Sequence, residues 1–420
     1  MPDIKPFKGW RYNLKKIKNI GTILAPPYDV ISKEKQRELY RHSPYNIVRL
    51  ILGKTSLTDT EENNRWTRAR DYLNRWIKEK VFLKDETECI YLYTQRFLFN
   101  NQWKTRKGFF ALLRLEKGSV ISHENTMPAP KKDRLELLRT TKANFEPIFC
   151  LYSDKNKNID AITKQYYKKP VLQIKWEDNT EHKLYIVARK DAIDKIRGII
   201  SSQKLLIADG HHRYEAAVQY WKESPVRNES LLNRVNSESP DGFVLVYFTN
   251  IDDRALKIFP IHRVVKGIRF DRCIPTLAPF FKIQEQTSLE KLTSCLDKKF
   301  KTNVFGIITD KKFYFLRLKN QGFFKKTDTQ RKNLRCKRLD TAVLEYRILP
   351  FLKSNGIRVD YTHNVHQAVA GVRQKKWDFA VLLQATTIEQ VKQIAFSGQK
   401  MPRKSTFFYP KPLSGLLIRI

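Results

Sequence analysis

The sequence has few cysteines, and their spacing gives them no common role. Five cysteines are spread over 420 residues, and no Cys-x-x-Cys pair occurs among them. This spacing argues against a disulfide framework and against a zinc site built from cysteines. We therefore expect reduced cysteines that mostly belong to the core.

The chain also lacks a long apolar run. No stretch of eighteen consecutive apolar residues occurs, and Met1–Phe7 does not form the apolar region of a signal peptide. These two absences predict a soluble, cytoplasmic protein without a membrane partner.

Acidic residues are scarce relative to basic ones. The chain has 43 Asp and Glu against 80 Lys and Arg, which gives a formal net charge of +37. Such an excess attracts nucleic acid or other polyanions. The basic residues are spread over the whole length, with one dense cluster at Lys325–Arg338. A general preference for lysine is the competing explanation, so charge alone does not decide between the two.

The most informative stretch is Leu205–Ala217. Leu205–Ala208 is an apolar run typical of a buried strand, and Tyr214–Tyr220 has helical composition. The residues between them, Asp209–Arg213, should form a strand-to-helix turn. Such a turn directs backbone N–H groups and a helix dipole at one point, which suits an anion. Its two imidazoles, carboxylate and guanidinium add proton transfer, metal affinity and bidentate phosphate binding. This turn is the first candidate for an active site.

Several other elements can be predicted from pattern alone. Ser32 is a typical N-cap for a helix that follows it. Asn46–Leu52 is a candidate strand interrupted by Arg49. Cys89–Tyr93 and Gly108–Leu115 are expected to be the strands of a hairpin. Asp29 and Arg49 are either a turn residue and an edge-strand charge or part of the site, and the sequence leaves both interpretations open.

Three further segments carry polar residues of interest. His123–Glu124 ends a strand-like stretch, followed by a proline-held loop and a predicted helix at Lys131–Thr141. His262 and Arg263 lie inside an apolar frame, where burial is costly unless they are paired. Met401–Lys411 is a basic, hydroxyl-rich segment that either binds phosphate or packs through its aromatic residues.

Six blocks of the sequence stand out together. They are Ala25–Ile31, His123–Glu124, Lys132–Leu135, Ala208–Glu215, Pro260–Arg263 and Met401–Phe407. In this order they resemble one widespread bacterial and archaeal family, known only as a domain of unknown function, DUF1015. The match spans essentially the whole chain.

A more distant resemblance suggests a chemistry. A His-Glu pair, a Pro-Ile strand and an Asp-Gly-His-His-Arg turn that opens a helix are similar to the free L-serine kinases of the ParB/sulfiredoxin superfamily. In those kinases the Glu of the pair is the proposed base and the turn holds the donor phosphates. The resemblance implies Glu124 as base and Gly210, His211, His212 and Arg213 as a phosphate cradle. Asp209 becomes a base or a carboxylate beside a metal ion.

The remaining roles follow from the same resemblance. Lys132 and Lys404 are further candidates for phosphate contact. The carboxylate of an amino-acid substrate needs an arginine, and the candidates for substrate binding are Arg263, Arg134, Arg49 and His123. Mg²⁺ and a nucleotide or pyrophosphate donor are implied, whereas the sequence specifies no metal ligands and no oligomeric state.

Three functions are open at this point. The first is a small-molecule phosphotransferase acting on a hydroxyl such as that of L-serine, with ATP, ADP or pyrophosphate as donor. The second is a ParB-like nucleic-acid-binding protein or nuclease, and the third is a phosphoserine phosphatase that uses the same site. The expected fold is mixed α/β. It has an N-terminal α+β region at 1–117, a ParB/serine-kinase-like domain at 118–265 and a C-terminal α+β domain at 266–420. Glu124 should lie within one substrate's reach of the turn, with Arg263 or Lys132 at the rim.

Overall fold

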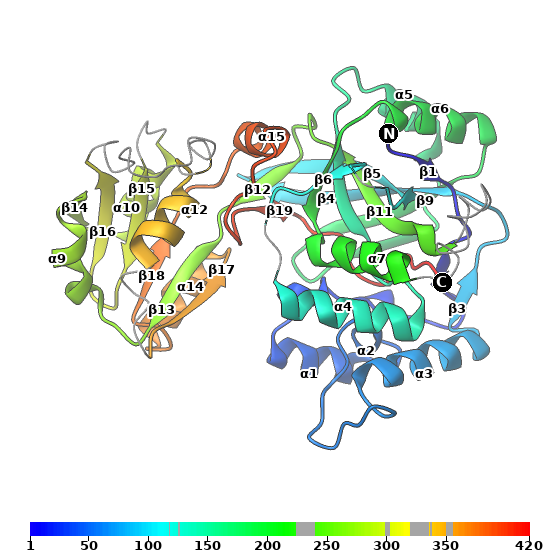
Figure 1. Cartoon of the computed structure of the whole chain (residues 1–420), viewed down its shortest axis with the longest axis horizontal. Helices are drawn as coiled ribbons and strands as arrows, with labels where there is room; N and C mark the ends of the chain where they lie inside the picture. Colours follow the sequence, from blue (N-terminus) through cyan, green and yellow to red (C-terminus); the bar gives the residue numbers. More distant parts are fainter. Residues whose placement is uncertain are drawn as a thin grey trace. The chain divides into compact units, whose positions relative to one another are not determined.

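The fold is mixed α/β, with one large and one smaller sheet (Figure 1). The computed structural model describes residues 1–116, 118–124, 127–223, 240–298, 303–319, 336, 338–349 and 356–420. Most of the basic cluster Lys325–Arg338 lies outside these residues. Among the described helices, none combines the length and the apolar character needed to cross a membrane.

Contacts divide the chain into two units. Unit 1 contains Met1–Ile121, Thr126–Lys257 and Pro410–Ile420, and unit 2 contains Ser122–Asn125 and Ile258–Tyr409. Unit 1 therefore joins the predicted region 1–117 to most of the predicted region 118–265, and it also includes the C-terminal end. The division into three functional regions stays a prediction.

A nine-stranded sheet forms the centre of unit 1. Its order is β6-β10-β7-β11-β5-β4-β9-β8, and β1 pairs with β5. The strands of unit 1, including the separate pair β2 and β3, are β1 (Ile4–Lys5), β2 (Trp10–Tyr12), β3 (Phe82–Lys84), β4 (Ile90–Phe99), β5 (Gln102–Arg114), β6 (Val120–Ile121), β7 (Ile148–Tyr152), β8 (Leu172–Lys175), β9 (Glu181–Val187), β10 (Leu205–Asp209) and β11 (Phe243–Asn250).

The start of one helix of unit 1 was predicted from its capping residue. Ser32 caps α1 as predicted, because its side chain accepts a hydrogen bond from the Lys35 amide. The helices are α1 (Lys33–His42), α2 (Val48–Ile51), α3 (Arg65–Lys78), α4 (Pro128–Thr141), α5 (Asn158–Thr163), α6 (Lys190–Ser201) and α7 (His211–Glu223), with short 3-10 turns η1 (Ile20–Thr22), η2 (Tyr28–Val30), η3 (Lys164–Tyr166) and η4 (Pro240–Gly242).

Strand alternation gives the large sheet two different faces. On one face Leu92, Phe109, Val246 and their neighbours form the apolar core against α5, α6 and α7. The other face carries buried tyrosines together with buried polar groups such as Arg106. The backbone of Pro410–Lys411 lies against this polar face, because Arg106 donates to the Pro410 carbonyl.

Two local predictions for unit 1 were wrong. Asn46–Leu52 is not a strand, because Val48–Ile51 forms the short helix α2. Pro128 and Pro130 are not in a loop, because α4 begins at Pro128 and the prolines occupy its first turn. Proline suits that turn, where its missing N–H would have had no partner within the helix. The hairpin of β4 and β5 is confirmed.

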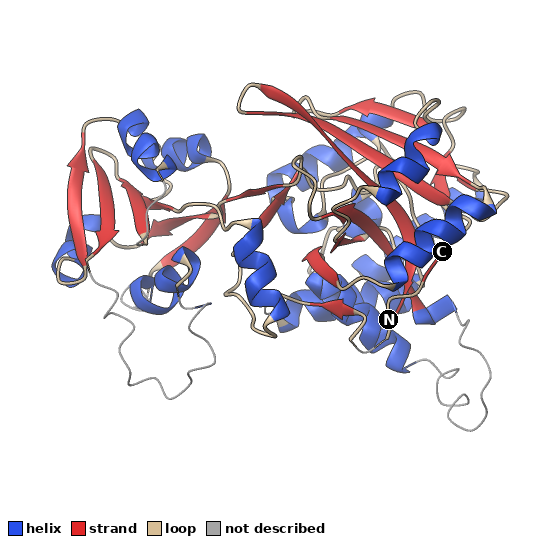
Figure 2. Ribbon diagram, turned by 90° about the horizontal axis from the view of Figure 1, so that it is seen from above, coloured by secondary structure: helices blue, strands red, loops and turns tan. Residues whose placement is uncertain are grey.

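Unit 2 is a six-stranded antiparallel sheet in the order β14-β16-β15-β18-β13-β17. Helices lie on both sides of it (Figure 2). The strands, with the separate pair β12 and β19, are β12 (Lys257–Phe259), β13 (His262–Lys266), β14 (Phe281–Gln286), β15 (Val304–Ile308), β16 (Phe313–Leu318), β17 (Arg358–Thr362), β18 (Phe379–Leu382) and β19 (Phe407–Tyr409). The helical segments are η5 (Phe270–Cys273), α9 (Ile274–Leu277), α10 (Leu289–Asp297), α12 (Asp340–Val343), the π-helical η8 (Leu344–Ile348), α14 (Val365–Arg373) and α15 (Ile388–Phe396).

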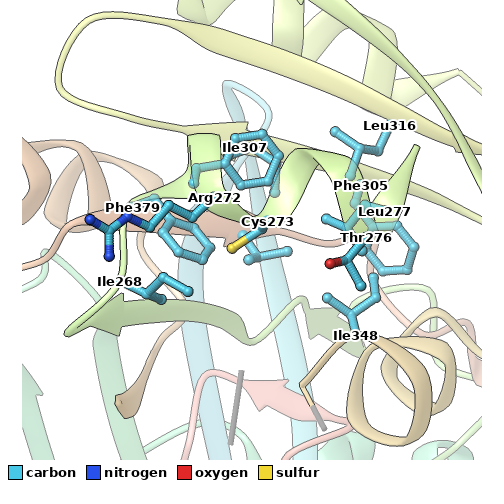
Figure 3. A pocket seen from close by; sticks show the side chains of 12 residues that line it. Ile268, Arg272, Cys273, Thr276, Leu277, Phe305, Ile307, Leu316, Ile348 and Phe379 are labelled. Carbon is cyan, nitrogen blue, oxygen red and sulfur yellow. The ribbon is translucent and has the colours of Figure 1, made fainter. Parts of the chain in front are cut away.

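One face of the unit 2 sheet encloses a small apolar cavity of about 50 Å³. Figure 3 shows the side chains of Cys273, Phe305 and Phe379 among those that surround it. A space of this size and lining holds no cofactor, so we regard it as a packing defect of the core.

Candidate functional site

The predicted strand-to-helix turn is confirmed. β10 ends at Asp209, Gly210 follows with a φ of +90°, and α7 begins at His211. Glycine suits this position for two reasons. A left-handed φ is costly for other residues, and a Cβ atom here would lie 3.2 Å from the Arg213 guanidinium. The Arg213 guanidinium is therefore packed closely against the Gly210 backbone, next to the first N–H groups of α7.

The Asp209 carboxylate lies between two cations. Its Oδ2 accepts a hydrogen bond of 2.7 Å from Nη2 of Arg213, and its Oδ1 is 2.7 Å from Nζ of Lys411. Since both oxygens are engaged in ion pairs, this carboxylate is poorly suited to accept a substrate proton. Its geometry instead suits the positioning of the two cations.

Lys411 is shared between two carboxylates. Its ammonium is also 2.8 Å from Oδ2 of Asp29, and its side chain is 9% exposed. Its backbone is held as well, because the amide of the buried Gln95 donates to the Lys411 carbonyl at 3.0 Å. Burial alone would lower the pKa of Lys411, but the charges of Asp209 and Asp29 outweigh it and raise the pKa. Lys411 is thus a fixed, permanently charged ammonium beside the turn.

A further carboxylate, the buried Glu146, supports Arg213. Burial would lower the pKa of Arg213, but Glu146 and Asp209 raise it overall. Arg213 also donates to the Pro147 carbonyl. Glu146 accepts hydrogen bonds from the Tyr28 amide at 3.0 Å and from the Ser414 hydroxyl at 2.9 Å. The segments around residues 28, 146 and 414 therefore meet at the Glu146 carboxylate, close to Arg213.

The two predicted histidines lie at the start of α7 and are half-buried. Nε2 of His212 accepts a hydrogen bond of 2.9 Å from the Met127 amide. An accepting Nε2 places the proton of the neutral ring on Nδ1. His212 therefore presents one N–H donor while it also holds the start of α4.

The remaining predicted residues of unit 1 differ in their surroundings. Arg134 is buried, donates to the Ile51 carbonyl at 2.8 Å and stacks over Tyr28 at 4.0 Å, so it lies next to the Glu146 group. Arg49 donates to the Tyr40 carbonyl at 2.8 Å and stacks on that ring, which ties α2 to α1. Lys132 is exposed on α4. Arg134 thus lies next to Glu146, which supports Arg213. Arg49 instead binds Tyr40 and joins two helices.

A cavity of about 50 Å³ adjoins Arg134, Glu146 and Arg213. It is large enough for a water molecule or two but not for a nucleotide. A phosphate donor would therefore have to approach the turn from its solvent side.

The other predicted site residues come together within unit 2. His123 is fully buried, and its Nε2 is 3.2 Å from the Thr406 hydroxyl. Oε1 of Glu124 accepts a hydrogen bond of 2.9 Å from the Lys404 amide, and the Lys404 carbonyl accepts one of 3.2 Å from Arg263. Burial lowers the pKa of Arg263. The expectation that Glu124 lies within one substrate's reach of Asp209–Arg213 stays a prediction.

The implied Mg²⁺ has no ready site at the turn. Carboxylate oxygens suit Mg²⁺, but those of Asp29 and Asp209 converge on the Lys411 ammonium. Elsewhere in the described residues, Glu38, His42 and Glu177 bring possible ligand atoms within 4.8 Å of one another. That group is exposed, and Lys35 already pairs with both glutamates.

Sequence reasoning found three members of the group around the turn only in part or not at all. It left Asp29 open, named Lys411 only within a basic segment, and did not single out Glu146. Asp29 and Lys411 both lie in conspicuous proline-containing segments, Ala25–Ile31 and Met401–Lys411. The charged residues of these two segments were the sequence feature from which Asp29 and Lys411 could have been identified as site residues.

Comparisons with known proteins place the chain in a family. No curated protein matches the sequence. Among solved structures, it is similar to a conserved hypothetical protein from Pyrococcus furiosus, with 15% identity, a TM-score of 0.38, and coverage of 74% of this chain and 94% of that one. It is also similar to a free serine kinase in complex with AMP, with 13% identity, a TM-score of 0.36, and coverage of 71% and 86%. A third structure, SbnI with a C-terminal truncation from Staphylococcus aureus, has 10% identity, a TM-score of 0.36, and coverage of 73% and 85%.

A family model described as protein of unknown function (DUF1015) matches residues 4–342, and the chain therefore belongs to this family.

Proposed function

We propose that the protein is a small-molecule phosphotransferase. It transfers a phosphate group to a hydroxyl such as that of free L-serine, with ATP, ADP or pyrophosphate as donor. The observation that carries the proposal is the Asp209–Arg213 turn, where a helix N-terminus meets two cations, Arg213 and Lys411, both held by Asp209.

This arrangement suits the electrostatic demands of phosphate transfer. The reaction needs in-line positioning and neutralisation of charge on the transferred group. Cations that are already fixed in place cost no reorganisation when the transition state forms. The N–H groups at the start of α7 add hydrogen-bond donors for phosphate oxygens.

The reaction also needs a base. Asp209 is a poor candidate, because both of its oxygens are paired with cations. We assign the base to Glu124, as the resemblance to the serine kinases implies. The serine hydroxyl gives its proton to this carboxylate while its oxygen bonds to the terminal phosphorus. The bond from that phosphorus to the bridging oxygen breaks, and the shortened donor leaves.

The test is a transfer assay with the purified full chain and L-serine. ATP, ADP and pyrophosphate are supplied in turn, with and without Mg²⁺, and O-phosphoserine is measured. Glu124→Gln should abolish turnover and leave donor binding nearly intact. Arg213→Ala should weaken donor binding about tenfold or more, because it removes a charged contact. Arg139→Ala, which removes an exposed guanidinium from α4, is the control and should change neither value.

Two outcomes would contradict the proposal. One is full transfer activity in both Glu124→Gln and Arg213→Ala. The other is the absence of transfer from any donor to any hydroxyl amino acid. Release of phosphate from O-phosphoserine in the same assay would identify the phosphatase instead.

A further inference from the structure

The tip of the β4–β5 hairpin exposes apolar side chains where polar ones are expected. Leu98 and Trp103 face each other across the hairpin and are 53% and 47% exposed. On the opposite face of the same strands, Phe97 and Arg106 are fully buried. Alternation normally places the polar residues outward and the apolar residues inward. The outward side chains of Leu98 and Trp103 therefore do not contribute to the core of unit 1, and they are candidates for contact with a binding partner.

The Trp103 ring packs against a cation. The guanidinium of Arg96 lies 4.2 Å from the ring centroid, and Oε1 of Glu181 accepts a hydrogen bond of 2.9 Å from that guanidinium. Asn100 and Asn101 both have positive φ, as a tight two-residue hairpin turn requires. An exposed aromatic ring whose neighbours are paired in this way is placed for stacking on a further planar group.

The surface next to Trp103 carries an excess of basic residues, with Glu181 as an acidic residue between Arg96 and Lys175. In the register of the sheet, Lys107 and Lys183 flank Thr94 on either side, and Lys175 lies opposite Glu181. Residues directly opposite each other in neighbouring strands share a face, and so do residues two positions apart in one strand. By this rule Lys107, Lys175 and Lys183 lie on the same face as Trp103. The hairpin sequence itself has no Asp or Glu between Glu88 and Glu116. We call the surface of Arg96, Leu98, Trp103, Lys107, Lys175 and Lys183 the hairpin face.

We propose that the hairpin face binds single-stranded nucleic acid. Cations that follow a backbone and an aromatic ring that stacks on a base are the two elements of such sites. A duplex fits less well, because its bases are already stacked and paired and offer no free surface to Trp103. The net charge of +37 favours the approach of any polyanion. This surface is separate from the Asp209–Arg213 turn, so it does not depend on the proposed phosphotransferase activity.

The test measures binding of the full chain to a fluorescein-labelled single strand of about 12 nucleotides, in DNA and RNA forms. Trp103→Ala should weaken binding about five- to 100-fold, whereas Trp103→Phe should retain most of the affinity. Lys183→Gln should reduce the slope of log affinity against log salt by about 0.7, since it removes one phosphate contact. Trp103→Ala should leave that slope unchanged.

Two matched variants serve as controls. Phe396→Ala removes an aromatic ring of similar exposure from α15, and Lys312→Gln removes an exposed lysine from unit 2. Neither should alter binding, and Trp103→Ala should leave any phosphate transfer unchanged.

Absence of binding by the unaltered chain would overturn the proposal. It would equally fail if Phe396→Ala or Lys312→Gln weakened binding as much as the hairpin variants do. Binding to anionic lipid vesicles that oligonucleotides do not compete for would assign the face to a membrane surface instead.

Discussion

Lys411 and Asp209 form an ion pair of 2.7 Å that ties the last residues of the chain to the turn after β10. The same ammonium is 2.8 Å from Asp29, close to the start of the chain. Because folding raises the pKa of Lys411, the contribution of these pairs is fully present below about pH 10 and is lost only in stronger alkali.

Replacing Lys411 by Met should therefore destabilise the protein at neutral pH. The variant leaves Asp29 and Asp209 without their shared cation, which costs about 3 kcal/mol for a buried pair. Urea unfolding at neutral pH measures this loss. Lys411→Arg keeps the charge and should recover part of the stability, and an equal loss in both variants would show that the charge is not what matters.

Gly210→Ala should disturb the turn more than a comparable glycine substitution elsewhere. Gly210 and Gly118 both have a positive φ, of +90° and +84°. An added Cβ at Gly118 meets nothing within 4 Å, whereas at Gly210 it meets the Arg213 guanidinium at 3.2 Å. Gly118→Ala should cost about 1 kcal/mol from the backbone alone, and Gly210→Ala about 1–2 kcal/mol more, because Arg213 must move. Equal losses of unfolding free energy would contradict the close packing of Arg213.

Two buried histidines should limit stability in acid. Burial lowers the pKa of His182 in unit 1 to about 4, and burial together with Arg263 and His363 lowers that of His262 in unit 2 to about 4. In the unfolded chain a histidine titrates near pH 6.5. The unfolded state therefore takes up these protons first, and stability falls as the pH decreases from about 6.5 to about 4.

Each histidine should contribute about 3 kcal/mol to this loss. His182→Gln and His262→Gln should each flatten the dependence of unfolding free energy on pH over that range. His42→Gln is the control, because His42 is exposed on α1. An unchanged acid profile in His182→Gln would mean that this imidazole has the same pKa in the folded and unfolded states.

Two buried cysteines should respond in opposite ways to enlargement. Cys273 borders the cavity of about 50 Å³ in unit 2, whereas Cys150 is fully buried in the core of unit 1. Cys273→Met should stabilise the protein by up to about 1 kcal/mol by filling space. Cys150→Met should destabilise it by about 1–3 kcal/mol through overpacking. Thermal unfolding compares the two, and a loss of stability in Cys273→Met would show that the cavity cannot take a larger side chain.

The elements that could be predicted from sequence are those with a local signal. The hairpin of β4 and β5 and the turn at Asp209–Arg213 have apolar runs interrupted by turn residues, and both are confirmed. Asn46–Leu52 lacked such a signal, because a short apolar run does not distinguish strand from helix. There the Asn46 side chain accepts a hydrogen bond from the Val48 amide and thereby supports the start of α2.

The candidate site was only partly predictable for a related reason. Asp209 and Arg213 are four residues apart, so their pairing follows from one turn of helix. Lys411 reaches the same place because the C-terminal segment returns to unit 1, and Glu146 because it precedes β7, which pairs with β10. No periodicity in the sequence encodes either approach. A carboxylate or an ammonium also gives no sequence indication of which distant partner will neutralise it.

The position of Pro410–Ile420 within unit 1 has a consequence for biosynthesis. Domains usually fold in the order in which they leave the ribosome. Here the residues of unit 2 up to Tyr409 are all synthesised before Lys411 emerges. Asp29 and Asp209 thus remain without Lys411 until the residues of unit 2 have been synthesised. Unit 1 therefore receives its third segment only after unit 2 has its full sequence.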